Sequence, residues 1–276
     1  MLEIASDEFR ALRDRIQRRL GLYFDDSKAY LLHSRLQARL VKCRVDGFAQ
    51  YSRYLDEAPG REREWDELAS LLVNNESYFF RERAQLEALT GPVLEEALGR
   101  STPLRIWSAA CASGEEPYTL AMVLLESGRI KKQECSIFAS DLSLRALERA
   151  FTGFYHELSF RATPPELIDR YFRPFESGFF IEEPVKSMVR FGRVNLLDAR
   201  AVASLGVQDV IFCRNVLIYF DRATQLEVAR RFWKTLRPGG YLFLGHAESL
   251  MQARDLYEPV ITRDTVYYRR RDDAQD

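Results

Sequence analysis

A change of pattern near Leu104 constrains the fold of this chain more than any other feature. From there on, short apolar runs alternate with helical segments, an order typical of parallel βαβ units. Strands are expected at 104–109, 136–140, 189–194, 210–213, 241–245 and 265–269, and helices at 117–126, 144–150 and 223–236. The last of these helices is expected to end at Pro238-Gly239-Gly240. The fold class predicted for this part of the chain is therefore α/β.

The chain before this point has a helical pattern instead. Apolar residues recur at helical spacing from Phe9 to Leu20, and the run ends at Gly21. We therefore predict an all-helical N-terminal domain with its linker over residues 1–85, followed by a sheet domain over residues 86–276.

One stretch of the sheet domain does not follow the alternating pattern. Residues 155–190 are rich in proline, phenylalanine and arginine. Within them, the apolar run 179–181 is expected to face the run 185–189 across a Glu-Glu-Pro turn. This stretch is predicted to form a small antiparallel β insert.

Composition narrows the class of protein. With 46% hydrophobic residues the chain can bury a core, and its formal net charge of −1 provides no overall attraction to nucleic acid. The four cysteines form no CxxC pair, which argues against a zinc site and against a disulfide framework. No apolar run reaches the roughly 18 residues of a membrane span, and the N-terminus lacks the pattern of a signal peptide. We expect a cytoplasmic protein without a metal, without membrane insertion and without a nucleic-acid partner.

A loop of small residues follows the first predicted strand. It runs from Ala109 to Gly114, and Pro117 after it suits the first turn of a helix. Small side chains let a ligand approach the backbone at the carboxyl end of a strand, where open α/β sheets bind their ligands. The alternative is a tight strand-to-helix turn without a ligand, because one glycine is weaker evidence than a full GxGxxG motif.

The second predicted strand ends in Asp141. A carboxylate at this position can accept hydrogen bonds from the ribose hydroxyls of a nucleoside. The alternative is a capping role for the helix that begins near Leu144. Because the chain has neither a GxGxxG motif nor a phosphate-binding GKS/T loop, a nucleoside without a pyrophosphate is favoured, such as S-adenosylmethionine.

The chain resembles the CheR family of chemotaxis receptor methyltransferases. The matching motifs follow the family's order and cover nearly the whole chain, and the run at 212–220 is the most specific of them. They are Asn-Glu-Ser-Tyr-Phe-Phe-Arg at 75–81, Trp-Ser-Ala-Ala at 107–110, Gly-Glu-Glu-Pro-Tyr at 114–118, Ala-Ser-Asp at 139–141, Val-Asn-Leu-Leu at 194–197, Phe-Cys-Arg-Asn-Val-Leu-Ile-Tyr-Phe at 212–220 and Leu-Arg-Pro-Gly-Gly at 236–240.

This resemblance implies both a fold and an activity. The fold would be a class I S-adenosylmethionine-dependent methyltransferase sheet of seven strands, with an all-helical N-terminal domain and a small antiparallel β insert. The enzyme would methylate glutamate side chains in the cytoplasmic helical bundle of chemoreceptors and release S-adenosylhomocysteine. Two alternatives stay open: a methyltransferase of the same fold that acts on a non-receptor signalling protein, and a scaffold that binds the cofactor without turnover.

The family's motifs also imply the residues that bind the cofactor. Arg81 would lie near the methionine carboxylate, and Glu116 and Asp141 near the amino end or the ribose. The other cofactor-binding residues that the resemblance implies are Asn75, Ser77, Asn195, Leu196, Arg214 and Asn215. Each has a simpler alternative: Asn75 and Ser77 as caps of a helix that contains Arg81, Glu116 as a first-turn acid, and Arg214 as a structural ion-pair partner.

Methyl transfer to a carboxylate needs little acid–base chemistry. A glutamate with a pKa near 4.3 is already ionised at neutral pH, so no general base is required and the three histidines are not expected to be catalytic. Positioning and exclusion of water remain as the sources of catalysis. Tyr219, together with Arg81, is the predicted catalytic residue, because its hydroxyl could orient the acceptor carboxylate. The alternative for Tyr219 is an ordinary half-buried aromatic residue.

Partner binding is predicted on the second helix. Lys28, Arg35, Arg39 and Lys42 recur on a stripe beside its apolar positions and, as exposed charges, could steer a glutamate-rich receptor helix. Such a stripe can also be a solvated face without a partner. In some members of the family the β insert binds a C-terminal pentapeptide of the receptor by strand addition. The stretch 175–189 looks short and contains only Gly178, so we predict an enzyme that does not depend on the pentapeptide.

Overall fold

The structure, a computed structural model, describes residues 6–73, 75–99 and 103–272. The chain divides into two compact units, each with its own core. The first unit comprises Met1–Asn74 and Tyr219–Thr224, and the second comprises Asn75–Ile218 and Gln225–Asp276. The first unit thus gives way to the second at residues 74 and 75, and the segment 75–85, which the sequence grouped with the helical domain and its linker, belongs to the second unit.

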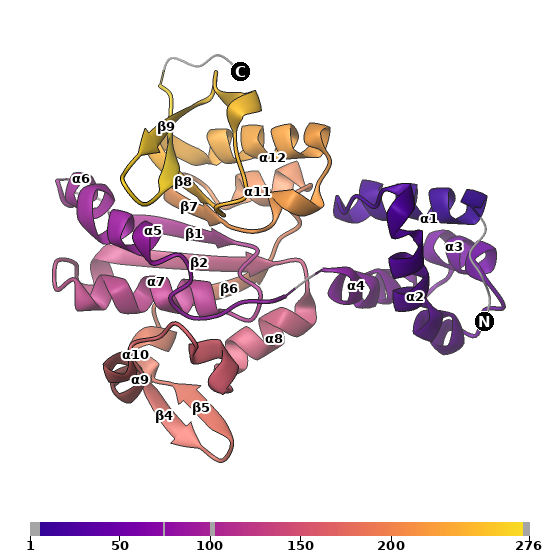
Figure 1. Ribbon diagram of the computed structural model, residues 1–276, viewed down its shortest axis with the longest axis horizontal. Coiled ribbons are helices and arrows are strands. Elements are labelled where there is room, and N and C mark those ends of the chain that lie inside the picture. The colour runs from indigo at the N-terminus through magenta and orange to yellow at the C-terminus, as the bar shows by residue number, and fades with distance from the viewer. Residues whose placement is uncertain (1–5, 74, 100–102, 273–276) are drawn as a thin grey trace. The chain divides into compact units, whose positions relative to one another are not determined.

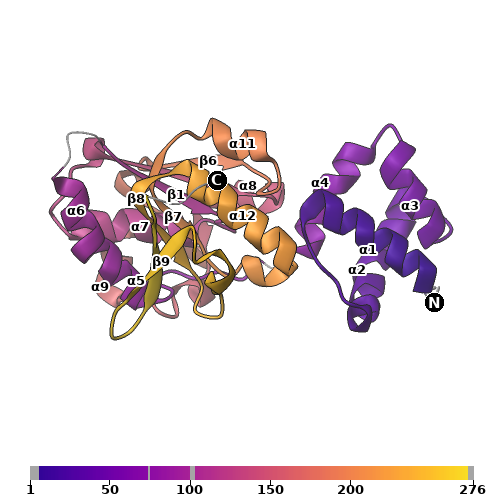
Figure 2. The same ribbon diagram turned by 90° about the horizontal axis from the view of Figure 1, so that it is seen from above.

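The first unit is helical, as predicted. Its helices enclose a core of apolar side chains such as Leu12 and Ile16, both fully buried, because these residues recur on one face of their helix. Gly21 adopts a φ of 78° directly after the first helix, a conformation that glycine provides without steric cost. The helices, visible in indigo and purple in Figure 2, are α1 (Ser6–Leu20), α2 (Ala29–Cys43), α3 (Phe48–Glu57) and α4 (Arg61–Leu72).

A short distant segment completes the first unit. The backbone N–H of Tyr23 donates to the carbonyl of Tyr219 at 2.8 Å, and Gln17 donates to Asp221 at 2.6 Å. Leu22 and Phe220 form an isolated antiparallel bridge. The segment Tyr219–Thr224 is therefore held by the end of α1 and the residues after it.

The second unit is built on a seven-stranded sheet with the order β6-β2-β1-β7-β8-β10-β9, as the resemblance implied. The neighbouring strands pair in parallel, except β10, which is antiparallel to both β8 and β9. The strands are β1 (Leu104–Ala109), β2 (Cys135–Asp141), β6 (Val189–Arg193), β7 (Gln208–Cys213), β8 (Leu236–Leu244), β9 (Tyr257–Ile261) and β10 (Val266–Arg270). The sequence pattern missed β9, which contains Pro259 and lies at the edge of the sheet, where a proline is tolerated.

Helices cover both faces of this sheet (Figure 1). Successive residues of a strand point to opposite faces. Thus Ile106 belongs to the core that includes Leu120 of α7, whereas the next residue, Trp107, packs edge-on against Phe232 of α12 at a ring distance of 5.3 Å. The helices of this unit are α5 (Arg83–Ala88), α6 (Leu94–Leu98), α7 (Glu115–Glu126), α8 (Leu144–Thr152), α9 (Pro165–Tyr171), α10 (Glu183–Lys186), α11 (Ala199–Ser204) and α12 (Arg222–Thr235).

The last helix ends within one residue of the predicted position. α12 ends at Thr235, and Leu236 already pairs with Gln208 as the first residue of β8. Gly239, with a φ of 63°, accommodates an irregularity inside β8 rather than a loop after the helix. The proline and glycines thus follow the helix as predicted, but they lie inside a strand that pairs with β7, which the sequence pattern did not predict.

The β insert is present, but the strand pairing predicted for it is wrong. Its sheet has the order β3-β5-β4 and is antiparallel, with β3 at Phe154–Tyr155, β4 at Phe172–Phe175 and β5 at Gly178–Ile181. The Glu-Glu-Pro segment does not form a turn between strands. It begins α10, because a proline in the first turn of a helix is favoured, and the chain then enters β6 of the main sheet.

Candidate functional site

Most of the predicted site residues lie at the ends of β1, β2, β6 and β7 or in the loops after them. These strands run parallel in the main sheet, so the loops after them leave the sheet on the same side. β1 lies between β2 and β7, and the order of the strands reverses there. Such a switch point is where open α/β sheets bind ligands.

The loop after β1 depends on small residues for its path. Ala110, Ala112 and Gly114 have φ values of 63°, 49° and 95°. A Cβ atom on Gly114 would lie 2.9 Å from the Cβ atom of Ala150 and 3.0 Å from the hydroxyl of Tyr155. At Gly114 the absence of a side chain is thus required by the turn itself, whether or not a ligand approaches it.

Asp141 joins the ends of β1 and β2. Its Oδ2 accepts the backbone N–H of Ala112 at 2.9 Å, and its Oδ1 accepts that of Ser143 at 2.8 Å. The helix that follows is capped by Ser143, whose hydroxyl accepts the N–H of Ala146, so the alternative of Asp141 as the cap is wrong. Burial raises the pKa of Asp141, although the backbone hydrogen bonds oppose this shift.

Arg214 connects β7 with the segment that precedes α5. Its side chain is only 3% exposed and lies 3.3 Å from Glu116 Oε2 and 3.5 Å from Glu82 Oε2. It also donates to the carbonyl oxygen of Arg81 at 2.6 Å. The ion-pair role considered for Arg214 is therefore present, and it ties three segments of the site together.

Glu116 is held from the opposite side by β1. The hydroxyl of Ser108 donates to its Oε1 at 2.6 Å. Burial raises the pKa of Glu116, and Arg214 only partly opposes this shift. The residue is in the first turn of α7, as its simpler alternative required, yet it also takes part in the buried cluster.

Glu115 forms a second buried acidic position. It is 3% exposed, and Ser113 donates to both of its oxygens at 3.0 and 3.1 Å. Ser77 also hydrogen-bonds to this carboxylate, while burial raises the pKa of Glu115. Because α5 begins only at Arg83, the alternative in which Asn75 and Ser77 cap a helix that contains Arg81 is wrong.

Two predicted residues follow β6. Asn195 accepts the backbone N–H of Leu197 through its side chain at 3.0 Å. Leu196 is 6% exposed, and its carbonyl oxygen accepts a hydrogen bond from Arg231 at 2.6 Å. These residues shape the loop after β6, next to β2 in the sheet.

Asn215 follows Arg214 and has an unusual backbone. Its φ is 60°, which is uncommon for a residue other than glycine. Its side-chain Oδ1 is buried, and within the part of the chain that the structure describes it has no hydrogen-bond donor. The backbone N–H of Asn215 donates to Glu248, a residue that sequence reasoning did not single out.

Tyr219, the predicted catalytic residue, ends a 3-10 helix at Leu217–Tyr219. It is half-buried and is grouped with the first unit, where its carbonyl accepts the N–H of Tyr23.

The predicted partner stripe is only partly exposed. Lys28 and Lys42 are exposed, and Arg35 donates to the carbonyl of Leu72 at 2.8 Å. The expectation that Arg39 is an exposed charge is wrong, because it is 9% exposed and forms a buried ion pair with Glu64. Sequence spacing placed Arg39 beside the apolar face but did not show the acid on α4 that draws it inside.

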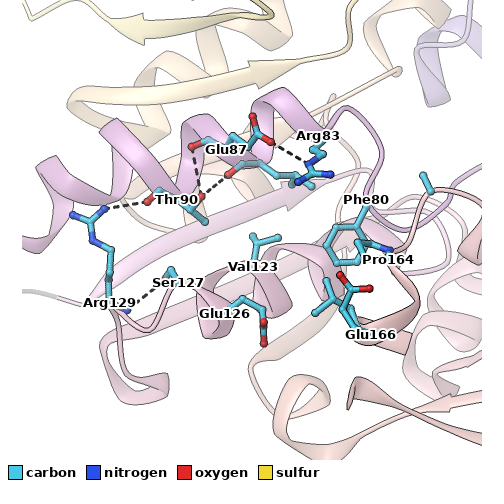
Figure 3. A pocket seen from close by; sticks show the side chains of 13 residues that line it. Phe80, Arg83, Glu87, Thr90, Val123, Glu126, Ser127, Arg129, Pro164 and Glu166 are labelled. Atoms are coloured by element: carbon cyan, nitrogen blue, oxygen red, sulfur yellow. Dashed lines mark hydrogen bonds and ion pairs between the residues drawn. The ribbon is translucent and has the colours of Figure 1, made fainter. Parts of the chain in front are cut away.

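A separate cavity of about 490 Å³ lies between α5, α7 and the residues before α9 (Figure 3). Its wall combines apolar side chains such as Phe80 and Val123 with charged ones. Arg83 pairs with Glu87, and Arg129 donates to the carbonyl of Thr90, so both arginines are bound to their own surroundings. The described residues that line this cavity include none of the predicted site residues.

Over the described residues, no cluster of three or more histidine, cysteine, aspartate or glutamate side chains could hold a metal ion. In the same part of the chain, no helix combines the length and apolar character needed to cross a membrane.

Comparison with known proteins identifies the family. Residues 75–266 match the model described as CheR methyltransferase, SAM binding domain, and residues 7–73 match the one described as CheR methyltransferase, all-alpha domain. The chain belongs to the CheR methyltransferase family. It is 35% identical over 273 residues to chemotaxis protein methyltransferase 2 of Vibrio cholerae, covering 96% of this chain and 94% of that protein. It is 34% identical over 277 residues to the chemotaxis protein methyltransferase of Salmonella typhimurium, covering 99% and 93%.

The chain is thus an S-adenosylmethionine-dependent methyltransferase, and the residues at the strand ends fit this cofactor. Glu115, Glu116 and Asp141 are buried acids whose pKa values burial raises, so a cation placed beside them would favour their ionised forms. S-adenosylmethionine carries a sulfonium and an ammonium group. The buried Oδ1 of Asn215 supplies an acceptor that no described donor of the protein satisfies.

Proposed function

We propose that this enzyme transfers the methyl group of S-adenosylmethionine to glutamate side chains in the cytoplasmic helical bundle of chemoreceptors, in the cytoplasm, and forms glutamyl methyl esters. The proposal is carried by the buried acidic cluster at the strand ends, which suits a cationic nucleoside, in a chain of the CheR family. The chemotaxis proteins that the chain resembles over nearly its full length support the choice of acceptor.

The proposed roles of the residues follow from their surroundings. Asp141 would accept from the ribose, since the carboxylate accepts backbone N–H groups of Ala112, Leu142 and Ser143 and, with about four lone-pair sites, retains acceptor capacity. Glu116 would face the amino end, and Arg81 would lie near the methionine carboxylate, with its backbone fixed by Arg214. Asn75, Ser77, Asn195, Leu196 and Asn215 complete the proposed set.

The reaction would depend on placement rather than on proton transfer. The cofactor supplies a methyl group on a positively charged sulfur. The acceptor carboxylate is ionised at neutral pH because the ordinary pKa of glutamate is about 4.3. Tyr219 would orient this carboxylate through its hydroxyl, and exclusion of water would strengthen the attraction between the opposite charges.

Lys28 and Lys42, both on the first unit, remain as exposed cations that could steer a glutamate-rich helix of the receptor. Arg35 stands beside them, with one guanidinium N–H directed to Leu72. Arg39 is no longer included, because its charge is buried. We also propose that the enzyme acts without a receptor C-terminal pentapeptide; tight binding of such a peptide in a titration would contradict this.

Radiolabel transfer tests the proposal. The full chain is incubated with methyl-labelled S-adenosylmethionine and receptor-enriched membranes, and base-labile label is expected on receptors. A receptor preparation with glutamine in place of the methylated glutamates serves as the control and should stay unlabelled. If the label appears on a different protein instead, that protein, and not the receptor, is the acceptor. Binding of S-adenosylhomocysteine without any transfer would indicate a non-catalytic scaffold.

A further inference from the structure

Glu248 gathers four backbone amides from two loops onto one carboxylate. It lies in the turn after β8. Its Oε2 accepts the N–H of Gly245 at 2.7 Å and that of Asn215 at 2.9 Å. Its Oε1 accepts the N–H of Val216 at 2.8 Å and that of Ile218 at 3.3 Å. The carboxylate therefore replaces a strand partner for the loop that follows β7.

This loop needs such a partner. Asn215 has a left-handed backbone with φ of 60°, which costs energy unless the surroundings fix it. The backbone directly after β8 also approaches Asn215 closely: a Cβ atom on Gly245 would lie 2.7 Å from Asn215 Nδ2 and 2.9 Å from Asn215 N. Three hydrogen bonds to Glu248 and this close approach hold Asn215–Ile218 against the end of β8.

We infer that Glu248 is a positioning residue for the cofactor site of this methyltransferase. By fixing the backbone of Asn215, it holds the buried Oδ1, which no described donor of the protein satisfies, in the place where a ligand can use it. Arg214, the ion-pair partner of Glu116, directly precedes this backbone, and Tyr219 directly follows Ile218. One carboxylate that need not touch the cofactor thus fixes the backbone of the loop that directly follows Arg214.

To hold the four backbone N–H groups, residue 248 needs two acceptor oxygens; a side chain of the same shape is not enough. In Glu248→Gln, one oxygen becomes an NH₂ group, which points its hydrogens at one of the two pairs of backbone N–H groups whichever way the amide is turned. Glu248→Asp keeps both oxygens on a side chain one methylene shorter. The expected order of function is wild type, then Glu248→Asp, then Glu248→Gln.

The measurements are calorimetric binding of S-adenosylhomocysteine and hydrogen exchange of a peptide that contains residues 214–218, both on the full chain. In Glu248→Gln, binding should weaken by about 10-fold or more, because hydrogen bonds to a charged acceptor are worth about twice neutral ones. The amides of Asn215, Val216 and Ile218 should exchange faster in the free protein. Glu248→Asp should recover part of both losses.

Asp209→Asn is the matched control. Asp209 is a carboxylate at the opposite end of β7 that accepts the backbone N–H of Arg105 at 2.8 Å and pairs with Arg237. Its variant should lower the unfolding temperature without weakening S-adenosylhomocysteine binding. An equal loss of binding in Asp209→Asn would overturn the inference, since general destabilisation would then explain the effect.

Unchanged binding in Glu248→Gln would likewise overturn it. If Glu248→Gln does not fold, Gly245→Ala tests the same loop from the β8 side, and normal binding in that variant would refute the positioning role. If the wild type itself does not bind S-adenosylhomocysteine, the cofactor assignment fails instead, so the two failures are distinguishable. The inference does not depend on which protein accepts the methyl group.

Discussion

Removal of the Arg39 side chain should destabilise the helical unit far more than loss of a surface charge would. Arg39 is 9% exposed and donates to both oxygens of Glu64, at 2.9 and 2.5 Å. Tyr51 donates to the same carboxylate at 2.5 Å. In Arg39→Met the chain keeps an unbranched apolar side chain at this position, but Glu64 loses the cation that pairs with it and stays buried.

The expected loss is about 3 kcal/mol at pH 7, the lower end for breaking a buried ion pair, because Tyr51 still satisfies part of the carboxylate. An exposed pair would contribute only about 0 to 1 kcal/mol. Adding Glu64→Gln to Arg39→Met should recover much of the loss, since no unpaired buried charge would remain.

The pH dependence gives a second signature. Burial would raise the pKa of Glu64, but hydrogen bonds from Arg39 and Tyr51 outweigh it and hold the pKa below its ordinary range near 4.3. A carboxylate with a lowered folded pKa stabilises the protein above its unfolded pKa, and this contribution is lost as pH falls through the folded pKa. In Arg39→Met the isolated Glu64 should instead take up a proton easily, so the deficit should shrink toward pH 4.

The assay is urea unfolding of the full chain, followed by hydrogen exchange of peptides from α2 and α4, at pH 7 and at pH 4.5. Arg63→Met, an exposed arginine on the same helix as Glu64, serves as the control and should change stability by less than about 0.5 kcal/mol. A loss below 1 kcal/mol in Arg39→Met, or a loss that is equal at the two pH values, would refute the reasoning.

Three further predictions concern the site and the partner surface. Asp141→Asn should weaken S-adenosylhomocysteine binding about 10-fold in calorimetry, since it loses a charged acceptor; unchanged affinity would remove Asp141 from the site. Tyr219→Phe should lower turnover with receptor while the affinity for S-adenosylhomocysteine stays unchanged; an equal turnover number would argue for a packing role. The double variant Lys28→Glu, Lys42→Glu should reduce the salt dependence of receptor methylation rates, as exposed steering charges do, with at most a loss of about 1 kcal/mol of stability from the exposed pair of Lys28 with Asp25; an unaltered salt dependence would contradict that role.

Local patterns in the sequence were enough to predict most elements of the sheet domain. β1 was predicted with its observed bounds, because its apolar residues and the small residues that follow it are enough to indicate a buried strand. β9 was missed because Pro259 is typical of loops and is tolerated only at the edge position that the fold provides. Likewise, the Glu-Glu-Pro segment fits both a turn and a helix start, and tertiary pairing decided between them.

Contacts between distant residues were beyond the reach of the sequence pattern. Arg39 and Glu64 are 25 positions apart, and Glu248 lies 33 positions after Asn215. Nothing in the spacing of basic residues on one helix distinguishes a buried arginine from an exposed one. Asp141 was found because its position at the end of a strand is itself a local signal, whereas Glu248 acts only through a loop that the fold brings to it.

Two buried arginine–glutamate pairs, Arg39 with Glu64 and Arg214 with Glu116, show how one kind of contact can serve two purposes. Arg39 gives Glu64 two hydrogen bonds, and the pKa of Glu64 lies below its ordinary range. Arg214 lies 3.3 Å from Glu116 and 3.5 Å from Glu82, and it donates to the carbonyl of Arg81, so its charge is divided between two acids. Burial prevails at Glu116, and its pKa is raised. Each arginine also faces a second acid, Glu67 for Arg39 and Glu82 for Arg214, so the number of charges does not distinguish the two pairs. The hydrogen bonding differs: Glu64 accepts two hydrogen bonds from Arg39 and one from Tyr51, whereas Glu116 accepts one from Arg214 and one from Ser108. A cation bound beside Glu116 would favour its ionised form, which is the behaviour expected of an acid in a binding site.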